Sequence, residues 1–143
     1  MNYIFSAIFL YFFLGFLLYI FQRRIVFNKS GHPGAPKDYN LDNTEEVYIK
    51  TEDNLKLLSW YHKGNNSLPL IVYFHGNSFH IGDRAYRIQR YIEKNWSVLL
   101  VSWRGFGGNK GNPTEKNLYK DAEAVLKWIK NNNEFKFKEL VIY

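Results

Sequence analysis

Two short motifs place polar and glycine residues directly after apolar runs that are typical of buried strands. The first is His75-Gly76-Asn77, which follows the apolar run 68–74. Open α/β sheets bind ligands at the carboxyl ends of their strands, and backbone N–H groups there can point at a developing oxyanion. Gly76 allows a reacting group to approach this backbone closely. The tripeptide alone is a weak signal, but it is compatible with acyl-transfer chemistry.

The second motif follows the next apolar run. Trp103-Arg104-Gly105-Phe106-Gly107-Gly108 leads into Asn112-Pro113-Thr114-Glu115, a helix-start signal. A tight strand-to-helix connection would need the same residues without any ligand, so this alternative stays open. The loop lacks the second glycine of a dinucleotide fingerprint, and no Gly-Lys-Ser/Thr sequence is present for a P-loop. We expect no cofactor.

These motifs need a sheet to position them. Residues 46–50 and 55–61 are β-prone and flank a short polar turn, which predicts an antiparallel hairpin. Strands are predicted at 68–74, 97–103 and 139–143, and helices at 86–94 and from Thr114, where apolar residues recur at helical spacing. Strands that alternate with helices indicate an α/β fold with parallel strands and crossover helices after the hairpin.

The N-terminus predicts a membrane anchor. Residues 3–21 carry no charge, and at about 1.5 Å per residue this run just spans a hydrocarbon core of about 30 Å. A cleaved signal peptide is the competing interpretation, but no Lys or Arg precedes the run. Arg23, Arg24 and Lys29 follow it, so the positive-inside rule places the globular part in the cytoplasm.

The domain organisation follows from these segments. We expect a single-pass transmembrane anchor at 1–24, a linker and lead-in loop at 25–44, and a truncated α/β domain at 45–143. Within the linker, the Gly, Pro, Asn and Asp residues of 28–43 predict neither helix nor strand.

Composition excludes several functions. The net charge is +6, but Lys and Arg are scattered among Asp and Glu, so nucleic acid is not an expected partner. The absence of cysteine excludes thiolate metal sites and a cysteine nucleophile. His75, His80 and Asp83 straddle a loop at spacings that do not share a helix face, so we expect no metal site.

The two motifs together resemble the α/β-hydrolase superfamily, and within it the membrane-anchored serine hydrolases of the Bem46 type, which are related to the animal abhydrolase-domain-13 proteins. Those carry His-Gly-Asn with a nearby Arg after the third strand, and Asp-Tyr-Arg-Gly-Tyr-Gly before a Gly, Pro, Ser/Thr, Glu run after the fourth. The N-terminal anchor and Pro-containing lead-in extend the resemblance to nearly the whole chain.

The resemblance implies roles for particular residues. Asn77 would supply the first oxyanion-hole amide, and His75 and Gly76 would shape the turn. Arg84 and Arg104 would brace neighbouring loops, with Gly105 and Gly107 supporting the second loop. His75 would be a hydrogen-bonding residue rather than the catalytic base, because the base comes last in the family's sequence order.

This chain also departs from the family pattern. Ser102 and Trp103 stand where the family has Asp and Tyr, which predicts weaker anchoring of the loop, and Phe79-His80 replaces a small polar pair. None of the seven serines lies in Gly-x-Ser-x-Gly. We therefore expect all three residues of the Ser-Asp-His triad beyond Tyr143, and no catalytic residue within this chain.

The resulting interpretation is the N-terminal part of a membrane-anchored esterase-, lipase- or thioesterase-like serine hydrolase, inactive alone. Three situations would produce it: a decayed gene, a second half encoded separately that docks on the last strand, or an incomplete copy of a longer protein. The alternative is a non-catalytic membrane protein that uses the partial sheet as a binding surface.

Overall fold

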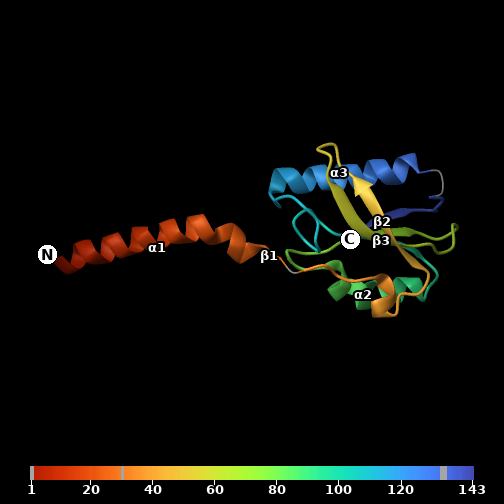
Figure 1. Ribbon diagram of the computed structural model, residues 1–143, viewed down its shortest axis with the longest axis horizontal. Helices are drawn as coiled ribbons and strands as arrows, with labels where there is room; N and C mark the ends of the chain where they lie inside the picture. Colours follow the sequence, from red (N-terminus) through yellow and green to blue (C-terminus); the bar gives the residue numbers. More distant parts are fainter. Residues whose placement is uncertain (1, 30, 133–134) are drawn as a thin grey trace.

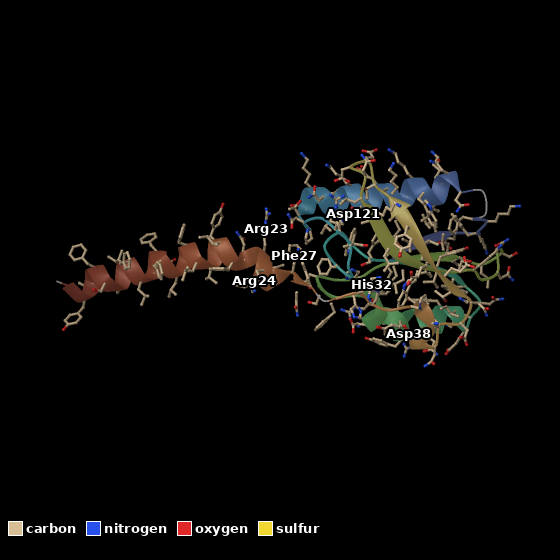
Figure 2. All side chains as sticks on the ribbon, viewed as in Figure 1. Arg23, Arg24, Phe27, His32, Asp38 and Asp121 are labelled. Atoms are coloured by element: carbon tan, nitrogen blue, oxygen red, sulfur yellow. The ribbon has the colours of Figure 1, made fainter. Side chains whose placement is uncertain are left out.

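A long apolar helix and a mixed α/β domain make up the chain in the computed structural model, which describes residues 2–29, 31–132 and 135–143. Helix α1 (Asn2–Val26) extends away from the domain (Figure 1), and its apolar side chains are exposed on all sides (Figure 2). Its Tyr3–Val26 segment is long and apolar enough to cross a membrane. A helix that is apolar all round requires a non-aqueous environment or a protein cover.

The segment predicted to be a linker contains two short elements. Strand β1 (Asn28–Lys29) pairs in parallel with β5 (Ser78–Phe79), and the 3₁₀ helix η1 (Pro36–Tyr39) begins at a proline. The expectation of neither helix nor strand in 28–43 was therefore wrong. Gly, Pro and Asn signal local turns, whereas β1 forms through a partner about 50 residues away in sequence.

A five-stranded mixed sheet forms the centre of the domain. Its order is β2-β3-β6-β4-β7, with bounds β2 Thr44–Lys50, β3 Lys56–His62, β4 Leu70–Phe74, β6 Ser97–Val101 and β7 Leu140–Ile142. The β2–β3 and β3–β6 pairs are antiparallel, and β6, β4 and β7 are parallel. The predicted class, a hairpin followed by parallel strands, is confirmed.

Both faces of the sheet are covered. Alternate residues of β6 enter different cores: Val98 and Leu100 pack with helix α2 (Ala85–Ile92) and the 3₁₀ helix η2 (Ile81–Arg84), whereas Leu99 and Val101 pack with α3 (Glu115–Asn131). Figure 1 shows the sheet between α2 and α3. This two-fold alternation is the side-chain period of a strand buried on both faces.

The register places the two motifs side by side. The last residues of β4 and β6, Phe74 and Val101, are partners across the parallel ladder. The turn at His75 and the loop at Ser102 therefore leave the same edge of the sheet next to each other. Thr114 caps α3 through its side chain, 3.2 Å from the N–H of Asn117, which confirms the predicted helix start and brings the loop back over the sheet.

Candidate functional site

Two hydrogen bonds, both donated by Trp103 and accepted by His75, join the carboxyl ends of β4 and β6. The backbone N–H of Trp103 donates to His75 Nε2 at 3.3 Å, and the Trp103 indole N–H donates to the His75 carbonyl at 2.7 Å. The indole also stacks on Phe74, with ring centroids 4.6 Å apart. The turn that begins at His75 is thus held in a defined position relative to the loop that begins at Ser102.

Burial sets the protonation state of His75. The residue is 2% exposed, and its ring packs edge-on against Phe106 with centroids 5.1 Å apart. Burial disfavours the imidazolium and lowers the pKa of His75 to about 4. A neutral ring whose Nε2 accepts a hydrogen bond carries its hydrogen on Nδ1. His75 is therefore a neutral hydrogen-bonding residue at pH 7.

Gly76 and Asn77 form the exposed part of the turn. Both residues are open to solvent, and within the described ranges neither backbone N–H has a backbone acceptor. A Cβ added at Gly76 would meet nothing within 4 Å, so a ligand can approach the backbone there. Unpaired N–H groups held at the end of a rigid strand are the kind of donor that stabilises an oxyanion.

The turn is also bonded to the end of α1. The Asn77 side-chain amide donates to the Val26 carbonyl at 2.8 Å, and the N–H of Asn28 donates to the Asn77 carbonyl at 3.1 Å. The ring of Phe27 meets Phe106 edge-on at 6.1 Å between centroids. The apolar helix therefore ends directly at the candidate turn, without a flexible spacer.

Arg104 joins three elements by hydrogen bonds. It is 2% exposed, and its Nε and Nη2 donate to Asp121 Oδ1 of α3 at 2.8 and 2.6 Å. Its Nη1 and Nη2 donate to the two carboxylate oxygens of Asp53, in the β2–β3 turn, at 2.7 and 3.2 Å. The guanidinium fork is thus occupied by two carboxylates, and it connects the loop after β6 to α3 and to the hairpin.

The electrostatics of this network favour its charged form. Burial opposes the charge of Arg104, but its hydrogen bonds to Asp121 and Asp53 outweigh burial and raise its pKa. Hydrogen bonds from Arg104 and Thr51 lower the pKa of Asp53. Arg104 and Asp53 are both charged at neutral pH, so Arg104 acts as a brace inside the fold.

Glycine is required at two positions of the loop. Gly105 has a φ of +77°, and a Cβ there would lie 2.8 Å from both the Gly111 carbonyl and Pro113 Cδ. Gly107 has a φ of +54°, and a Cβ there would lie 2.9 Å from Ser102 Oγ. Side chains are disfavoured at both because of the left-handed backbone and the close neighbours. The two glycines therefore let the loop fold tightly.

Asn109 anchors the loop where Ser102 departs from the family's Asp. The Asn109 side chain accepts from the N–H of Leu58 in β3 at 2.9 Å and donates to the Ser102 carbonyl at 2.9 Å. The Ser102 hydroxyl donates to the Phe106 carbonyl at 3.3 Å. These bonds hold both ends of the loop.

Arg84 and the His80–Asp83 pair lie in or next to η2, and His80 Cβ would be 3.7 Å from a Cβ added at Gly107 of the loop. Arg84 is half-buried at the end of η2, and its charge is near enough to contribute to the lowered pKa of His75. His80 Nδ1 lies 2.9 Å from Asp83 Oδ2, a local contact that closes η2. Across the described ranges, no group of three His, Cys, Asp or Glu residues is placed to hold a metal ion.

Sequence reasoning missed Asp53, Asp121 and Asn109. Asp121 had a detectable signal, because an acidic residue interrupts the apolar stripe that runs through Leu118, Ala122 and Val125. An acid on the buried face of a helix needs a buried cation, and Arg104 was the available candidate. Asp53 and Asn109 had no such signal, since polar residues are ordinary in a hairpin turn and in a glycine-rich loop.

The fold is of the α/β-hydrolase type, of which the chain covers a part. The chain is 29% identical over 141 residues to protein bem46 of Schizosaccharomyces pombe, covering 91% of this chain and 46% of the relative. It is 26% identical over 136 residues to the alpha/beta hydrolase domain-containing protein WAV2 of Arabidopsis thaliana, covering 89% and 44%. The predicted Bem46-type relationship is confirmed.

Two further proteins that are similar to this chain have names that state an activity. The chain is 27% identical over 119 residues to the lysophosphatidylserine lipase ABHD12 of Danio rerio, covering 66% of this chain and 30% of the relative. An esterase of Pyrococcus furiosus superposes with a TM-score of 0.63 at 25% identity, covering 81% of this chain and 46% of the esterase. No known family model matches the chain. The chain spans less than half the length of these four proteins.

Proposed function

We propose that this chain forms the N-terminal part of a membrane-anchored serine hydrolase that cleaves an ester, thioester or amide. The observation that carries the proposal is the turn His75-Gly76-Asn77 at the end of β4, where the N–H groups of the exposed residues Gly76 and Asn77 have no backbone acceptor within the described residues. In acyl transfer, such a donor stabilises the tetrahedral intermediate when a serine attacks the carbonyl. Removing one donor typically costs about a hundred- to thousandfold in rate.

The nucleophile belongs, in this proposal, to polypeptide outside residues 1–143. The nucleophile elbow of the family follows a strand that leads into Gly-x-Ser-x-Gly, and it supplies the second oxyanion N–H. Strand β7 lies beside β4, and none of the chain's serines has that motif. An elbow directly after β7 would face the Asn77 turn across one strand spacing, about 4.8 Å.

The edge of β7 is the proposed docking position for the rest of the sheet. Within the described residues β7 has a single neighbour, β4, and Ile142 and Tyr143 are 58% and 59% exposed. An uncovered apolar edge strand is a template for further strand pairing. The continuing strands could come from the same polypeptide or from a separately encoded half, and without them we expect no hydrolase activity.

The membrane anchor indicates where the substrate is located. We propose that α1 spans the bilayer once, with the domain on the cytoplasmic side where Arg23 and Arg24 favour it. Because Val26 is bonded to Asn77, the oxyanion turn would stand at the bilayer surface. This position suits an acyl ester of a membrane lipid, a class that includes the substrate named for the relative ABHD12.

Covalent labelling with a fluorophosphonate tests this proposal. The purified chain is incubated with the probe alone and together with the product of any coding sequence that continues or accompanies it. We expect label on the polypeptide that contains Gly-x-Ser-x-Gly and none on residues 1–143. Label on the 17.0 kDa chain itself would show that a serine within it is the nucleophile, and no label on either would leave a binding role.

A further inference from the structure

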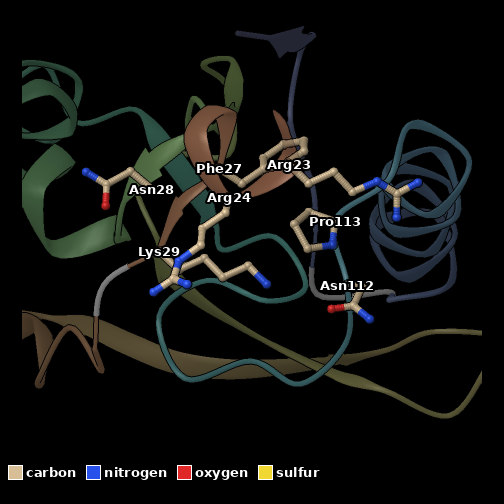
Figure 3. Close-up of a pocket in the computed structure, with 7 residues that line it drawn as sticks. All are labelled: Arg23, Arg24, Phe27, Asn28, Lys29, Asn112 and Pro113. Atoms are coloured by element: carbon tan, nitrogen blue, oxygen red, sulfur yellow. The ribbon is translucent and has the colours of Figure 1, made fainter. Parts of the chain in front are cut away.

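A basic pocket lies where α1 meets the domain, and the proposed hydrolysis does not use it. Its volume is about 510 Å³. It is lined by residues from the end of α1, from β1 and from the lead into α3, among them Arg23, Arg24, Phe27, Lys29, Asn112 and Pro113 (Figure 3). We refer to this cavity as the basic pocket.

The positive charge of the basic pocket is not neutralised by the chain. No acidic residue lines it, and in the parts of the chain that the structure describes Arg23, Arg24 and Lys29 form no ion pair. Glu115 is close in sequence but accepts from the Tyr119 hydroxyl at 3.3 Å instead. Three cations around one cavity create a strong potential for an anion.

The fold holds the pocket open. A Cβ at Gly105 would lie 2.8 Å from Pro113 Cδ and 3.3 Å from Lys29 Nζ, so these two residues occupy their positions because Gly105 has no side chain. On the other side, the Asn77–Val26 hydrogen bond fixes the end of α1. In Figure 3, Arg23 and Arg24 extend in different directions from the end of α1, and Pro113 lies on the Arg23 side.

The pocket lies at the depth of lipid headgroups if α1 spans the bilayer. The uncharged run ends at Phe21, and Arg23 and Arg24 follow within about 3 to 5 Å along the helix axis. Phe27 gives the cavity an aromatic wall. Helix α3 also begins just after Pro113, and its N-terminal end adds positive potential.

We propose that the basic pocket binds the phosphate of one anionic phospholipid headgroup. The inference rests on the proposed membrane insertion of α1. Arginine donates to phosphate oxygens as a fork and lysine adds a mobile point charge. The free phosphate ion shares this chemistry, but a lipid explains why the cations gather directly below the apolar run. The bound headgroup would fix the orientation of the oxyanion turn toward the bilayer.

Native mass spectrometry of the full-length chain in nonionic detergent tests the proposal. The chain is titrated with dioleoylphosphatidylglycerol, with dioleoylphosphatidylcholine and with inorganic phosphate. We expect one phosphatidylglycerol to bind about tenfold more tightly than phosphatidylcholine, since each cation near an anionic lipid contributes about 1 kcal/mol. Equal binding of the two lipids would overturn the proposal, and tighter binding of inorganic phosphate would reassign the site to the free ion.

Matched variants locate the site. Arg24→Gln with Lys29→Gln should abolish the preference for phosphatidylglycerol, and Asn112→Asp should weaken it by placing an anion in the pocket. Arg87→Gln with Arg90→Gln removes the same amount of charge from exposed positions on α2. This control should leave the preference for phosphatidylglycerol unchanged. Loss of the phosphatidylglycerol preference in both double variants would mean a nonspecific charge effect and would overturn the assignment of lipid binding to the basic pocket.

Alkaline extraction of membranes that contain the wild-type chain tests the membrane insertion of α1 separately from lipid binding by the basic pocket. Retention of the chain in the membrane together with equal lipid binding would refute the pocket alone. Release of the chain by alkali would refute the insertion of α1, on which both the pocket and the membrane-facing turn depend.

Discussion

The two segments that leave the sheet after β4 and β6 begin side by side, yet they use their hydrogen bonds in opposite ways. The loop after β6 bonds to its surroundings through Arg104 and Asn109, which reach α3 and the hairpin. The turn after β4 is held by His75 and by the Asn77 side chain, but it leaves the N–H groups of Gly76 and Asn77 without a backbone acceptor in the described ranges.

This difference gives the loop after β6 a supporting role and leaves the backbone donors of the turn after β4 available to a ligand. A buried ion pair makes the loop rigid, but a guanidinium that already binds two carboxylates has little capacity left for a ligand. Exposed N–H groups contribute nothing to stability, since water or a ligand must satisfy them. The rigid loop after β6 supports the turn after β4, so that the N–H groups of the turn are held in fixed positions. Oxyanion stabilisation requires donors that are preorganised in this way.

Replacing the buried acid should produce the largest effect. Asp121→Ala leaves the 2%-exposed Arg104 without its interior partner, and the unpaired buried charge should lower the free energy of unfolding by about 3 to 5 kcal/mol. Urea unfolding of the full-length chain in detergent, followed by tryptophan fluorescence, measures the loss.

Asp53→Ala is the matched control for this substitution. The Asp53 side chain is 36% exposed, so solvent screens its pairing and water can replace it, and we expect a loss of about 1 kcal/mol or less. Equal losses for the two variants would mean that the network does not derive its strength from burial.

Acid should destabilise the two segments in different pH windows. His75 has a folded pKa of about 4 against 6.5 for an unperturbed ring, so the unfolded state takes up the proton first. This contribution is complete above pH 6.5 and is lost as the pH falls toward 4, an effect of about 3 kcal/mol. The lowered pKa of Asp53 gives a loss that begins near its unfolded value, about 4, and continues downward.

Unfolding free energies measured at a series of pH values check this separation. His75→Asn should flatten the profile between pH 6.5 and 4 while leaving the decline below pH 4 in place, and Asp53→Asn should do the reverse. An unchanged slope above pH 4 in His75→Asn would contradict the assignment of a buried neutral His75.

Asn77→Ala should have an intermediate effect that is local to the turn. The variant removes the bond to the Val26 carbonyl and should weaken docking of the α1 end by about 1 kcal/mol. Hydrogen exchange at the backbone N–H groups of Phe27 and Asn28 measures this weakening. Asn66→Ala, at an exposed position, is the control. Since the proposed oxyanion donor is the backbone N–H, hydrolysis by a triad-complete protein should persist in Asn77→Ala.

Phe79→Gly should give the smallest effect, and a stabilising one. Phe79 has a φ of +65° and is 47% exposed, so glycine relieves a left-handed backbone at little cost in packing. We expect a gain of about 1 kcal/mol or less, because glycine also increases the entropy of the unfolded chain. Phe79→Ala keeps the strained backbone and should show no gain in the same urea experiment.

Local sequence determined the main elements of this protein, though not the short β1 and η1. The apolar run of α1, the alternation of buried strands and the Thr114 cap depend on neighbours within a few residues, so their patterns identified helix, strands and both turns. The resemblance of the two motifs to the Bem46 type, which the relatives confirm, likewise depended on contiguous residues.

Tertiary structure alone decided which elements meet. The bonds of Arg104 join residues 17 and 51 positions apart, and the Asn77–Val26 bond also spans 51 positions. No local pattern encodes such pairs, because a polar residue in a turn has the same signature whether it faces water or a distant partner. The brace beneath the loop and the direct attachment of the apolar helix to the His75-Gly76-Asn77 turn therefore became visible only when the folded sheet brought these segments together.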